Sequence, residues 1–239
     1  MVGILKGLID LVFPPLCAFC GTPLAEDEGA EVCPGCLRTI HFVSPPICPR
    51  CGLPFAGGVG DEHLCGQCLR GQWHFGAARA LGLYDGPIRE AIHLLKYRGK
   101  SFLVKPLVGL LSVGYPFIDY DAYDLMVPVP LHPKRLRERG FNQALVLGRA
   151  MERREGIPCT GFVLRKTRPS APQVHLSPGE REANVKGSFA VIDPKRVRGK
   201  KILLIDDVMT TGSTVNECAR ELLKAGAGGV DVFTLARAV

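Results

Sequence analysis

Two adjacent carboxylates, Asp206 and Asp207, follow an apolar run at 202–205 and precede a short loop of hydroxyl side chains. The run predicts a buried parallel strand, and open α/β sheets bind their ligands at the carboxyl ends of such strands. Gly212 lets the loop backbone approach a ligand closely, and the N-terminal end of the following helix favours a phosphate. The two carboxylates would then face hydroxyl groups or a hydrated Mg²⁺. The loop hydroxyls belong to Thr210, Thr211, Ser213 and Thr214.

A plainer interpretation of this stretch is a buried strand with a polar turn and a Ser/Thr helix cap. That interpretation accounts for the strand and the cap, but not for two adjacent carboxylates beside three threonines. The stretch resembles the phosphoribosyl pyrophosphate (PRPP) motif of type I phosphoribosyltransferases. In that family the two acids hold the ribose hydroxyls and the Thr/Gly loop holds the 5-phosphate. The resemblance therefore implies a PRPP site.

Eight of the ten cysteines stand in four C-x-x-C pairs in the first third of the chain. Two such pairs supply the four thiolates that Zn²⁺ takes in a tetrahedral site. Their order predicts two successive zinc ribbons, at 17–36 and 48–68, although a crossed arrangement of the pairs stays open. Four thiolates leave no position for water, so the predicted role of the zinc is structural. The eight residues are Cys17, Cys20, Cys33, Cys36, Cys48, Cys51, Cys65 and Cys68.

Disulfides and redox pairs are the alternatives for these cysteines. Disulfides suit a secreted chain, and nothing in the sequence indicates secretion. Redox C-x-x-C motifs usually occur singly beside a βαβ unit. Cys159 and Cys218 are isolated, and Cys218 is expected to be a buried apolar residue of a helix. His41 and His63 are expected to be bystanders, because each predicted site already has four ligands.

Strand and helix patterns alternate from residue 78 onward. This alternation predicts an α/β fold with a doubly wound parallel sheet, as in type I phosphoribosyltransferases, over 76–239. Residues 1–75 are expected to form an N-terminal helix and a small double zinc ribbon. Strands are expected over 80–84, 125–131, 202–205 and 230–236, and helices over 88–97, 102–111, 142–151 and 214–225.

The charge is unevenly distributed along the chain, whose formal net charge is +7. Residues 1–75 are acidic overall and the remainder is basic, which suits phosphate-rich ligands, including nucleic acid. No apolar run is long enough to span a membrane, so a cytoplasmic protein is expected. The apolar segment at 2–12 is expected to be a short helix packed on the protein, with weak contact to a membrane surface as the alternative.

Two further polar stretches follow the predicted strand at 125–131. Four cations lie within six residues at 134–139, and their mutual repulsion suggests a polyanionic partner; a solvated loop entering a helix is the alternative. Residues 164–189, which we call the lid segment, are polar and without periodicity. A loop of more than twenty residues inside a compact domain is usually functional, and this one could close over a site.

Together these stretches give the chain a close resemblance to the ComF (GntX-like) family of competence-associated, phosphoribosyltransferase-like proteins with an N-terminal double zinc ribbon. The marks are Phe13-Pro14-Pro15 before the ribbons, the 95–100 sequence LKYRGK, the 127–143 stretch, the lid segment and the PRPP motif. The resemblance covers nearly the whole chain. It implies a pyrophosphate loop at Val129, Pro130 and Leu131, with Arg135 and Arg139 nearby. It also implies a flexible loop over PRPP that carries Arg168, Gln173 and Arg181. Mg²⁺ is expected to bind together with PRPP.

One position departs from the purine-salvage members, which have an Asp acting as general base where this chain has Thr210. Threonine cannot take that role at neutral pH, so a purine-base transferase is disfavoured and the catalytic residues stay unknown. The resemblance implies a PRPP-binding protein linked to DNA uptake and natural transformation, which handles single-stranded DNA with the uptake machinery. The alternative is an active phosphoribosyltransferase of nucleotide metabolism with an unknown acceptor. A third interpretation joins the two, with PRPP binding as a switch or a relic on a DNA-handling protein.

Overall fold

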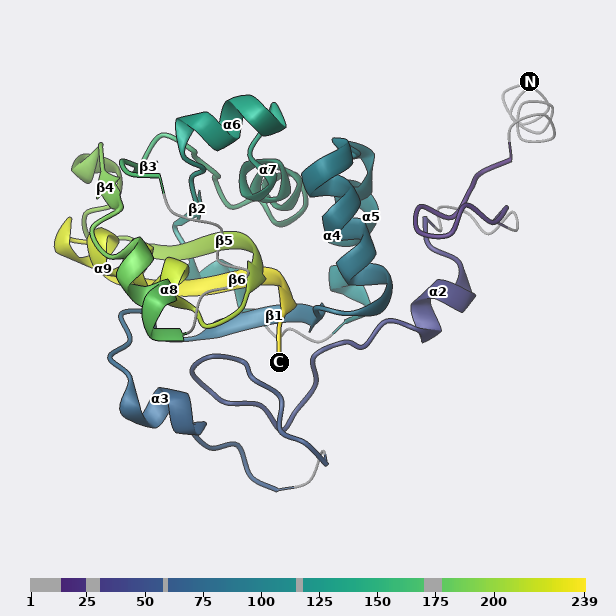
Figure 1. Ribbon diagram of the computed structural model, residues 1–239, viewed down its shortest axis with the longest axis horizontal. Helices are drawn as coiled ribbons and strands as arrows, with labels where there is room; N and C mark the ends of the chain where they lie inside the picture. The colour runs from purple at the N-terminus through teal and green to yellow at the C-terminus, as the bar shows by residue number, and fades with distance from the viewer. Residues whose placement is uncertain (1–13, 25–30, 58–59, 115–117, 170–177) are drawn as a thin grey trace.

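The computed structural model describes residues 14–24, 31–57, 60–114, 118–169 and 178–239. Their centre is a four-stranded sheet in the order β1-β6-β5-β2, with every neighbouring pair parallel (Figure 1). The predicted parallel sheet is therefore confirmed. Its strands are β1 (Ala78–Leu83), β2 (Leu125–Pro128), β5 (Lys201–Met209) and β6 (Gly229–Arg237).

Helices cover both faces of this sheet, as a doubly wound fold requires. Alternate residues of β5 point to opposite faces: Leu203 and Ile205 join one buried cluster, and Ile202 and Leu204 join another. The first cluster includes residues of α4 (Gly86–Arg98), α5 (Val104–Gly109) and α7 (Gln143–Glu155), which Figure 1 shows above the sheet. The second includes residues of α9 (Ser213–Lys224).

Local sequence signals account for the ends of several helices. Asn142 caps α7 by accepting a hydrogen bond from the Ala144 N–H at 3.1 Å, and Gly156 ends the helix at φ 78°. The helix predicted over 102–111 is shorter than expected. It divides into 3₁₀ turns at Ser101–Leu103 and Leu110–Ser112 around α5, because Pro106 lacks a donor and Gly109 is a weak helix former.

The lid segment contains more regular structure than the sequence predicted. β3 (Leu164–Lys166) pairs antiparallel with β4 (Phe189–Val191), and Pro178–Val185 form helix α8. The prediction of one long irregular loop was therefore wrong for these residues. Val185 and Phe189 are almost fully buried beside α9, and this packing holds the returning chain in place.

The chain closes both edges of the sheet with short backbone contacts. At the β1 edge, the Val43 N–H donates to the Leu81 carbonyl at 3.1 Å and the Leu83 N–H to the His41 carbonyl at 2.8 Å. At the β2 edge, the Met126 N–H donates to the Pro158 carbonyl at 2.8 Å. Residues 41–43 lie between the two cysteine-rich segments, so the inter-ribbon linker forms part of the sheet's border.

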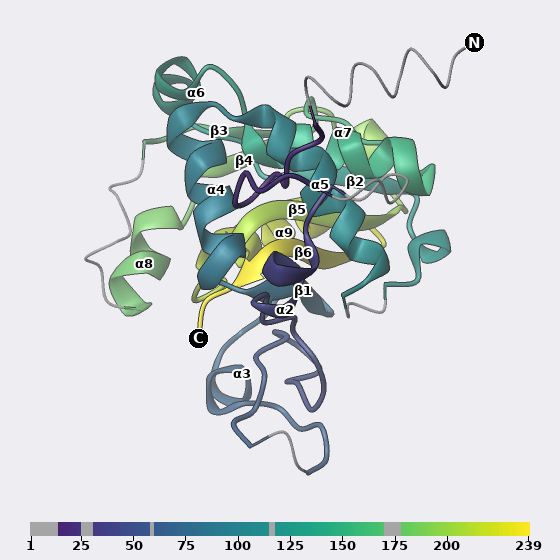
Figure 2. The same ribbon diagram turned by 90° about the vertical axis from the view of Figure 1, so that its right-hand side faces the viewer.

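Each cysteine-rich segment carries one short helix. These are α2 (Pro34–Arg38) and α3 (Gly66–Arg70); Figure 2 shows α3 below the sheet. The remaining elements are α6 (Pro133–Arg139) and 3₁₀ turns at Tyr120–Ala122 and Pro194–Arg196. Among the described helices, none combines the length and apolar character needed to cross a membrane. The helix predicted at 2–12 lies outside the described residues.

Candidate functional site

A cavity of about 570 Å³ lies at the carboxyl ends of β2 and β5. Residues from all three stretches singled out in the sequence line it, although they are far apart in the chain. Its position is where doubly wound sheets bind their ligands. The predicted residues in its lining are Val129, Pro130, Leu131, Arg135, Arg139, Arg181, Asp206, Asp207, Thr210 and Thr214.

Asp207 is held by a lysine that the sequence analysis did not assign to the site. Lys96 Nζ of α4 lies 2.9 Å from Asp207 Oδ1, and the two side chains are only 17% and 12% exposed. Burial lowers the pKa of Lys96, but the charge of Asp207 outweighs it, and the net pKa is raised. Asp207 therefore has a charge-assisted contact before any ligand arrives.

Asp206 is in a different electrostatic state. Burial, with the neighbouring charge of Asp207, raises its pKa to about 7. Asp206 accepts a hydrogen bond from the Asp207 N–H at 2.9 Å, and the charges of Lys96 and Lys166 oppose the rise in its pKa. With a pKa of about 7, Asp206 is partly protonated near neutral pH. Ligand hydroxyls or a cation would stabilise the ionised form of Asp206.

The hydroxyl loop forms a tight turn into α9. Gly212 has φ 81°, a left-handed conformation that suits glycine, and it is the N-cap of α9. It has no side chain to cap the helix, so first-turn N–H groups stay available to an anion. A small hollow of about 30 Å³ is lined by Asp206, Thr210, Gly212, Ser213 and Thr214.

Thr211 is placed differently from the other loop residues. Its hydroxyl lies 2.9 Å from that of Ser213, and its carbonyl accepts a hydrogen bond from Gln67 at 3.0 Å. The contact with Ser213 thus stabilises the turn itself, and the contact with Gln67 connects the turn to α3. The other predicted hydroxyls lie closer to the hollow.

Cations and aromatic rings line the cavity opposite the carboxylates. The Arg139 guanidinium lies 5.5 Å from the centre of the Tyr97 ring and donates to Gln143 at 3.2 Å. Arg89 and His93 of α4 line the same wall. Sequence reasoning missed these α4 residues as site residues, although Tyr97 lies in the 95–100 stretch that it had noted.

Two predicted residues of the lid segment are not placed in this cavity. Arg168 donates to the carbonyls of Gly187, at 2.8 Å, and Lys186, at 3.2 Å. It thereby connects the two ends of the lid segment. Gln173 lies outside the described residues.

The eight paired cysteines form two clusters, one with the ligands of 17–36 and one with those of 48–68. Within each cluster the ligand atoms lie within 4.8 Å of one another, so the sequential pairing is confirmed over the crossed one. Sγ–Sγ separations of 3.8 Å (Cys17 to Cys36) and 3.6 Å (Cys51 to Cys65) fit a Zn²⁺ tetrahedron, whose edges are about 3.8 Å for Zn–S bonds of about 2.3 Å. Both clusters therefore suit structural zinc.

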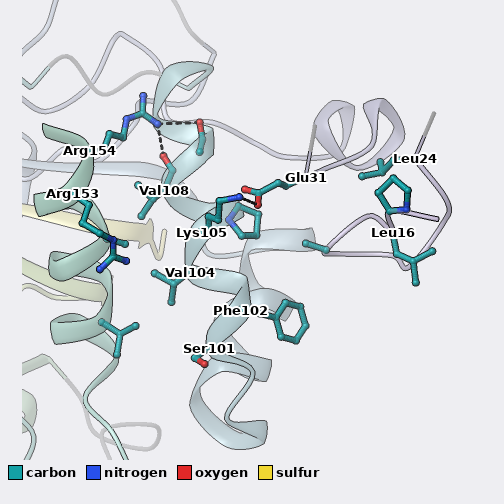
Figure 3. Close-up of a pocket in the computed structure, with 16 residues that line it drawn as sticks. Leu16, Leu24, Glu31, Ser101, Phe102, Val104, Lys105, Val108, Arg153 and Arg154 are labelled. Atoms are coloured by element: carbon teal, nitrogen blue, oxygen red, sulfur yellow. Dashed lines mark hydrogen bonds and ion pairs between the residues drawn. The ribbon is translucent and has the colours of Figure 1, made fainter. Parts of the chain in front are cut away.

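A second hollow, of about 880 Å³, lies between the first cysteine segment, α5 and α7 (Figure 3). Its lining is mainly apolar, and its carboxylate, Glu31, is paired with Lys105 at 2.6 Å. Arg154 donates to the Val108 carbonyl at 2.8 Å and to Ser112 at 2.7 Å. This hollow lacks the paired acids and the hydroxyl loop, so the smaller cavity is the candidate site.

Two family models match the chain. One is the double zinc ribbon domain, over residues 8–69, and the other is the phosphoribosyl transferase domain, over residues 107–238. The second match covers more than half of the chain. Lys96 and Tyr97 lie before its first residue.

Curated relatives match over most of their length. DNA utilization protein YhgH of Salmonella typhi is 34% identical over 237 residues, covering 95% of this chain and 99% of that protein. Competence protein F of Haemophilus influenzae is 29% identical, covering 73% of this chain and 78% of that protein. Competence protein ComFC of Bacillus subtilis is 30% identical, covering 66% and 63% respectively.

Proposed function

Because this chain belongs to the ComF family, with a double zinc ribbon and a phosphoribosyl transferase domain, we propose that it binds PRPP with Mg²⁺. The observation that carries this proposal is the convergence of Asp206, Asp207 and the hydroxyl loop in one cavity with basic side chains. The carboxylates hold the ribose hydroxyls, and the loop from Thr210 to Thr214 holds the 5-phosphate. Residues 129–131, with Arg135 and Arg139, receive the pyrophosphate and its Mg²⁺.

Lys96 has a defined part in this scheme. Without ligand it neutralises Asp207 at 2.9 Å. This contact orients Asp207 beside Asp206, so the two carboxylates can accept hydrogen bonds from neighbouring hydroxyls as soon as PRPP enters. Arg181 of α8 lines the cavity from the lid segment, and we propose that it closes over the bound pyrophosphate together with Gln173.

We propose further that the protein handles single-stranded DNA during DNA uptake, in the cytoplasm with the uptake machinery. Its relatives are named DNA utilization and competence proteins, and its net charge of +7 suits a polyanion. Four of its cations stand on α6, and two of them, Arg135 and Arg139, line the cavity. Binding of a labelled single strand is expected to weaken steeply with salt. Binding that is absent at low salt would contradict this role.

A second candidate function is phosphoribosyl transfer to an acceptor. The cavity continues beyond the carboxylates to Tyr84, His93 and Tyr97, and its volume of about 570 Å³ is typical of small-molecule sites. With threonine at 210, the acceptor would need to be a nucleophile that requires no carboxylate base. Exchange of labelled pyrophosphate into PRPP, retained at moderate salt, would favour this candidate.

Calorimetry of PRPP with Mg²⁺ tests the central proposal on the wild-type protein and on the Asp206→Asn/Asp207→Asn variant. We expect binding by the wild type and its loss in the variant, because the ribose hydroxyls lose two charged acceptors. Absence of PRPP binding by a folded, zinc-replete wild type would contradict the proposal. The stabilities of the two single variants, considered next, show whether a loss of PRPP binding comes from the site or from unfolding of the variant.

The single variants are expected to change stability in opposite directions. The folded-state pKa of Asp206, about 7, lies above the ordinary value of 3.8, so the folded protein loses stability as the pH rises from about 4 to about 7, and the loss is complete above pH 7. Asp206→Asn should therefore stabilise the ligand-free protein at pH 8, by about 1 kcal/mol, and the gain should vanish as the pH falls toward 4. Asp207→Asn leaves Lys96 without its partner and should destabilise by about 2 kcal/mol. Thermal unfolding between pH 4 and 8 measures both effects, and a destabilising Asp206→Asn at pH 8 would contradict the assigned charge state.

A further inference from the structure

The second zinc ribbon, which we define as residues 48–68, contacts the hydroxyl loop directly. Its helix α3 carries the ligand Cys68 and, beside it, Gln67. Gln67 Nε2 donates to the Thr211 carbonyl at 3.0 Å. A side chain of the ribbon thus fixes a backbone group in the middle of the loop.

The segment leaving this ribbon also holds the start of α9. Asn216, in the first turn of α9, accepts a hydrogen bond from the His74 N–H at 2.7 Å and donates to the Gln72 carbonyl at 2.9 Å. Between these residues, the Trp73 ring lies against Gly212. A Cβ on Gly212 would lie 3.0 Å from Trp73 Cζ3 and 2.8 Å from Met209 Cε, so the backbone and these side chains are in close contact.

A buried arginine holds the start of the loop from the sheet side. Arg237, at the end of β6, is only 3% exposed, and its Nη1 donates to the carbonyls of Met209, at 3.1 Å, and Thr210. The loop is therefore fixed by the sheet at its start and by the ribbon at Thr211.

We propose that the second zinc ribbon is part of the phosphate site, because it holds residues 210–214 in the conformation that accepts a sugar 5-phosphate. Gln67 is the ribbon's positioning residue, and Asn216 receives the segment that leaves the ribbon. Trp73 of that segment packs against Gly212. This inference rests on the proposed PRPP site, and it explains the conformation of the loop by its contact with the ribbon. A loop held in place before binding loses less conformational freedom when the phosphate arrives, which strengthens binding of that group alone.

The test compares ligands that share only part of PRPP. The variant Gln67→Ala/Asn216→Ala removes the hydrogen bond from the ribbon to the loop and the two hydrogen bonds between Asn216 and the segment that leaves the ribbon, and it keeps all eight zinc ligands. Lys105→Ala, which removes the ion pair to Glu31 of the first cysteine segment, is the matched control. Calorimetry measures binding of ribose 5-phosphate, of PRPP with Mg²⁺ and of pyrophosphate with Mg²⁺, and metal analysis confirms equal zinc content.

We expect about tenfold weaker binding of ribose 5-phosphate and PRPP by the double variant, equivalent to about 1.4 kcal/mol. Its affinity for pyrophosphate should stay within about twofold of wild type, and the control should match wild type for every ligand. Equal weakening for all three ligands, or no weakening, would overturn the inference while leaving PRPP binding by the wild type intact. Gln67→Ala alone should shift the same two affinities in the same direction, by a smaller factor.

Hydrogen exchange provides a second measurement that needs no ligand. The backbone amides of 210–214 should exchange faster in the double variant than in the wild type and the control. Hydrogen exchange separates the two proposals. Failure of the wild type to bind PRPP contradicts the proposed function. Unchanged amide exchange in the double variant contradicts the inference that the ribbon stabilises the loop conformation.

Discussion

The two zinc ribbons have the same ligands but differ in how they are integrated into the fold. In each, the fourth cysteine is the third residue of a five-residue helix, Cys36 in α2 and Cys68 in α3. All four cysteines of the second ribbon are buried, whereas in the first Cys20 is exposed and Cys33 and Cys36 are half-buried. The same set of ligands thus stands in a fully buried site in one ribbon and in a partly exposed site in the other.

The surroundings explain this difference. The cysteines of the second ribbon belong to the buried cluster that includes β5 and α9, and its Arg50 carbonyl accepts a hydrogen bond from the Ala78 N–H of β1 at 2.6 Å. The first ribbon belongs to the other buried cluster through Cys17, while Cys33 and Cys36 pack against that cluster only partly buried. It also contacts α5 through Glu31 and Lys105, a lysine whose side chain is 83% exposed. Position relative to the sheet, rather than the metal site itself, determines what each ribbon contributes to stability.

The largest contrast is expected from removing one zinc ligand in each ribbon. Cys68→Ser should lower the main melting temperature by about 10 °C or more, because loss of metal there opens the cluster that the sheet shares. Cys36→Ser should lower it by less than about 3 °C, since the first ribbon can unfold locally. Calorimetric melting in the presence of zinc measures both. Similar losses for the two variants would refute the contrast between core and periphery.

A smaller contrast is expected from the glycine after the second cysteine of each ribbon. Gly21 and Gly52 have φ 73° and 65°, so alanine is strained at both, by about 1–2 kcal/mol. A Cβ at Gly52 would also lie 2.6 Å from the Ala78 carbonyl oxygen, whereas a Cβ at Gly21 meets nothing within 4 Å.

Gly52→Ala should therefore cost about 3 kcal/mol or more of global stability, and Gly21→Ala about 1 kcal/mol confined to the first ribbon. Urea unfolding followed by tryptophan fluorescence reports the global transition, because Trp73 packs beside the loop. A Gly21→Ala variant that is as unstable as Gly52→Ala would show that the first ribbon is coupled to the core.

The smallest effect is expected from Lys105→Ala. Its ion pair with Glu31 is exposed on the lysine side, and such pairs contribute about 0–1 kcal/mol. We expect a change in melting temperature below about 2 °C, which decreases further in high salt. A loss above about 2 kcal/mol would mean that the first ribbon is attached to α5 more firmly than this contact indicates.

Local sequence signals predicted the parallel sheet, the two metal clusters and the placement of Asp206 and Asp207 near a strand's carboxyl end. These features depend on runs of neighbouring residues or on repeated pairs, which a single sequence displays. The strand was expected to end before the two acids, whereas β5 continues through them to Met209. The lid segment misled the prediction because α8 is polar, and its packing through Val185 appears only in the folded chain. The boundary between residues 75 and 76 stays a prediction.

Contacts between distant residues were beyond prediction. Gln67 and Thr211 are separated by 144 positions, and an amide side chain in a zinc knuckle gives no sign of its partner. Lys96 stood in a noted stretch, yet its pairing with Asp207 follows from how α4 packs on one face of the sheet. Tertiary packing, rather than local sequence preference, thus determines that Lys96 and the second ribbon contact the candidate site.

The contacts at 41–43 and at Met126 have a consequence for how copies of this chain meet. Free strand edges are templates on which another chain can add a strand, and proteins commonly block them. Here the inter-ribbon linker occupies the β1 edge, and the chain around Cys159 occupies the β2 edge, where it bridges to Met126. The sheet cannot be extended at these positions without displacing its own chain, which protects a Val- and Leu-rich parallel sheet from edge-to-edge aggregation.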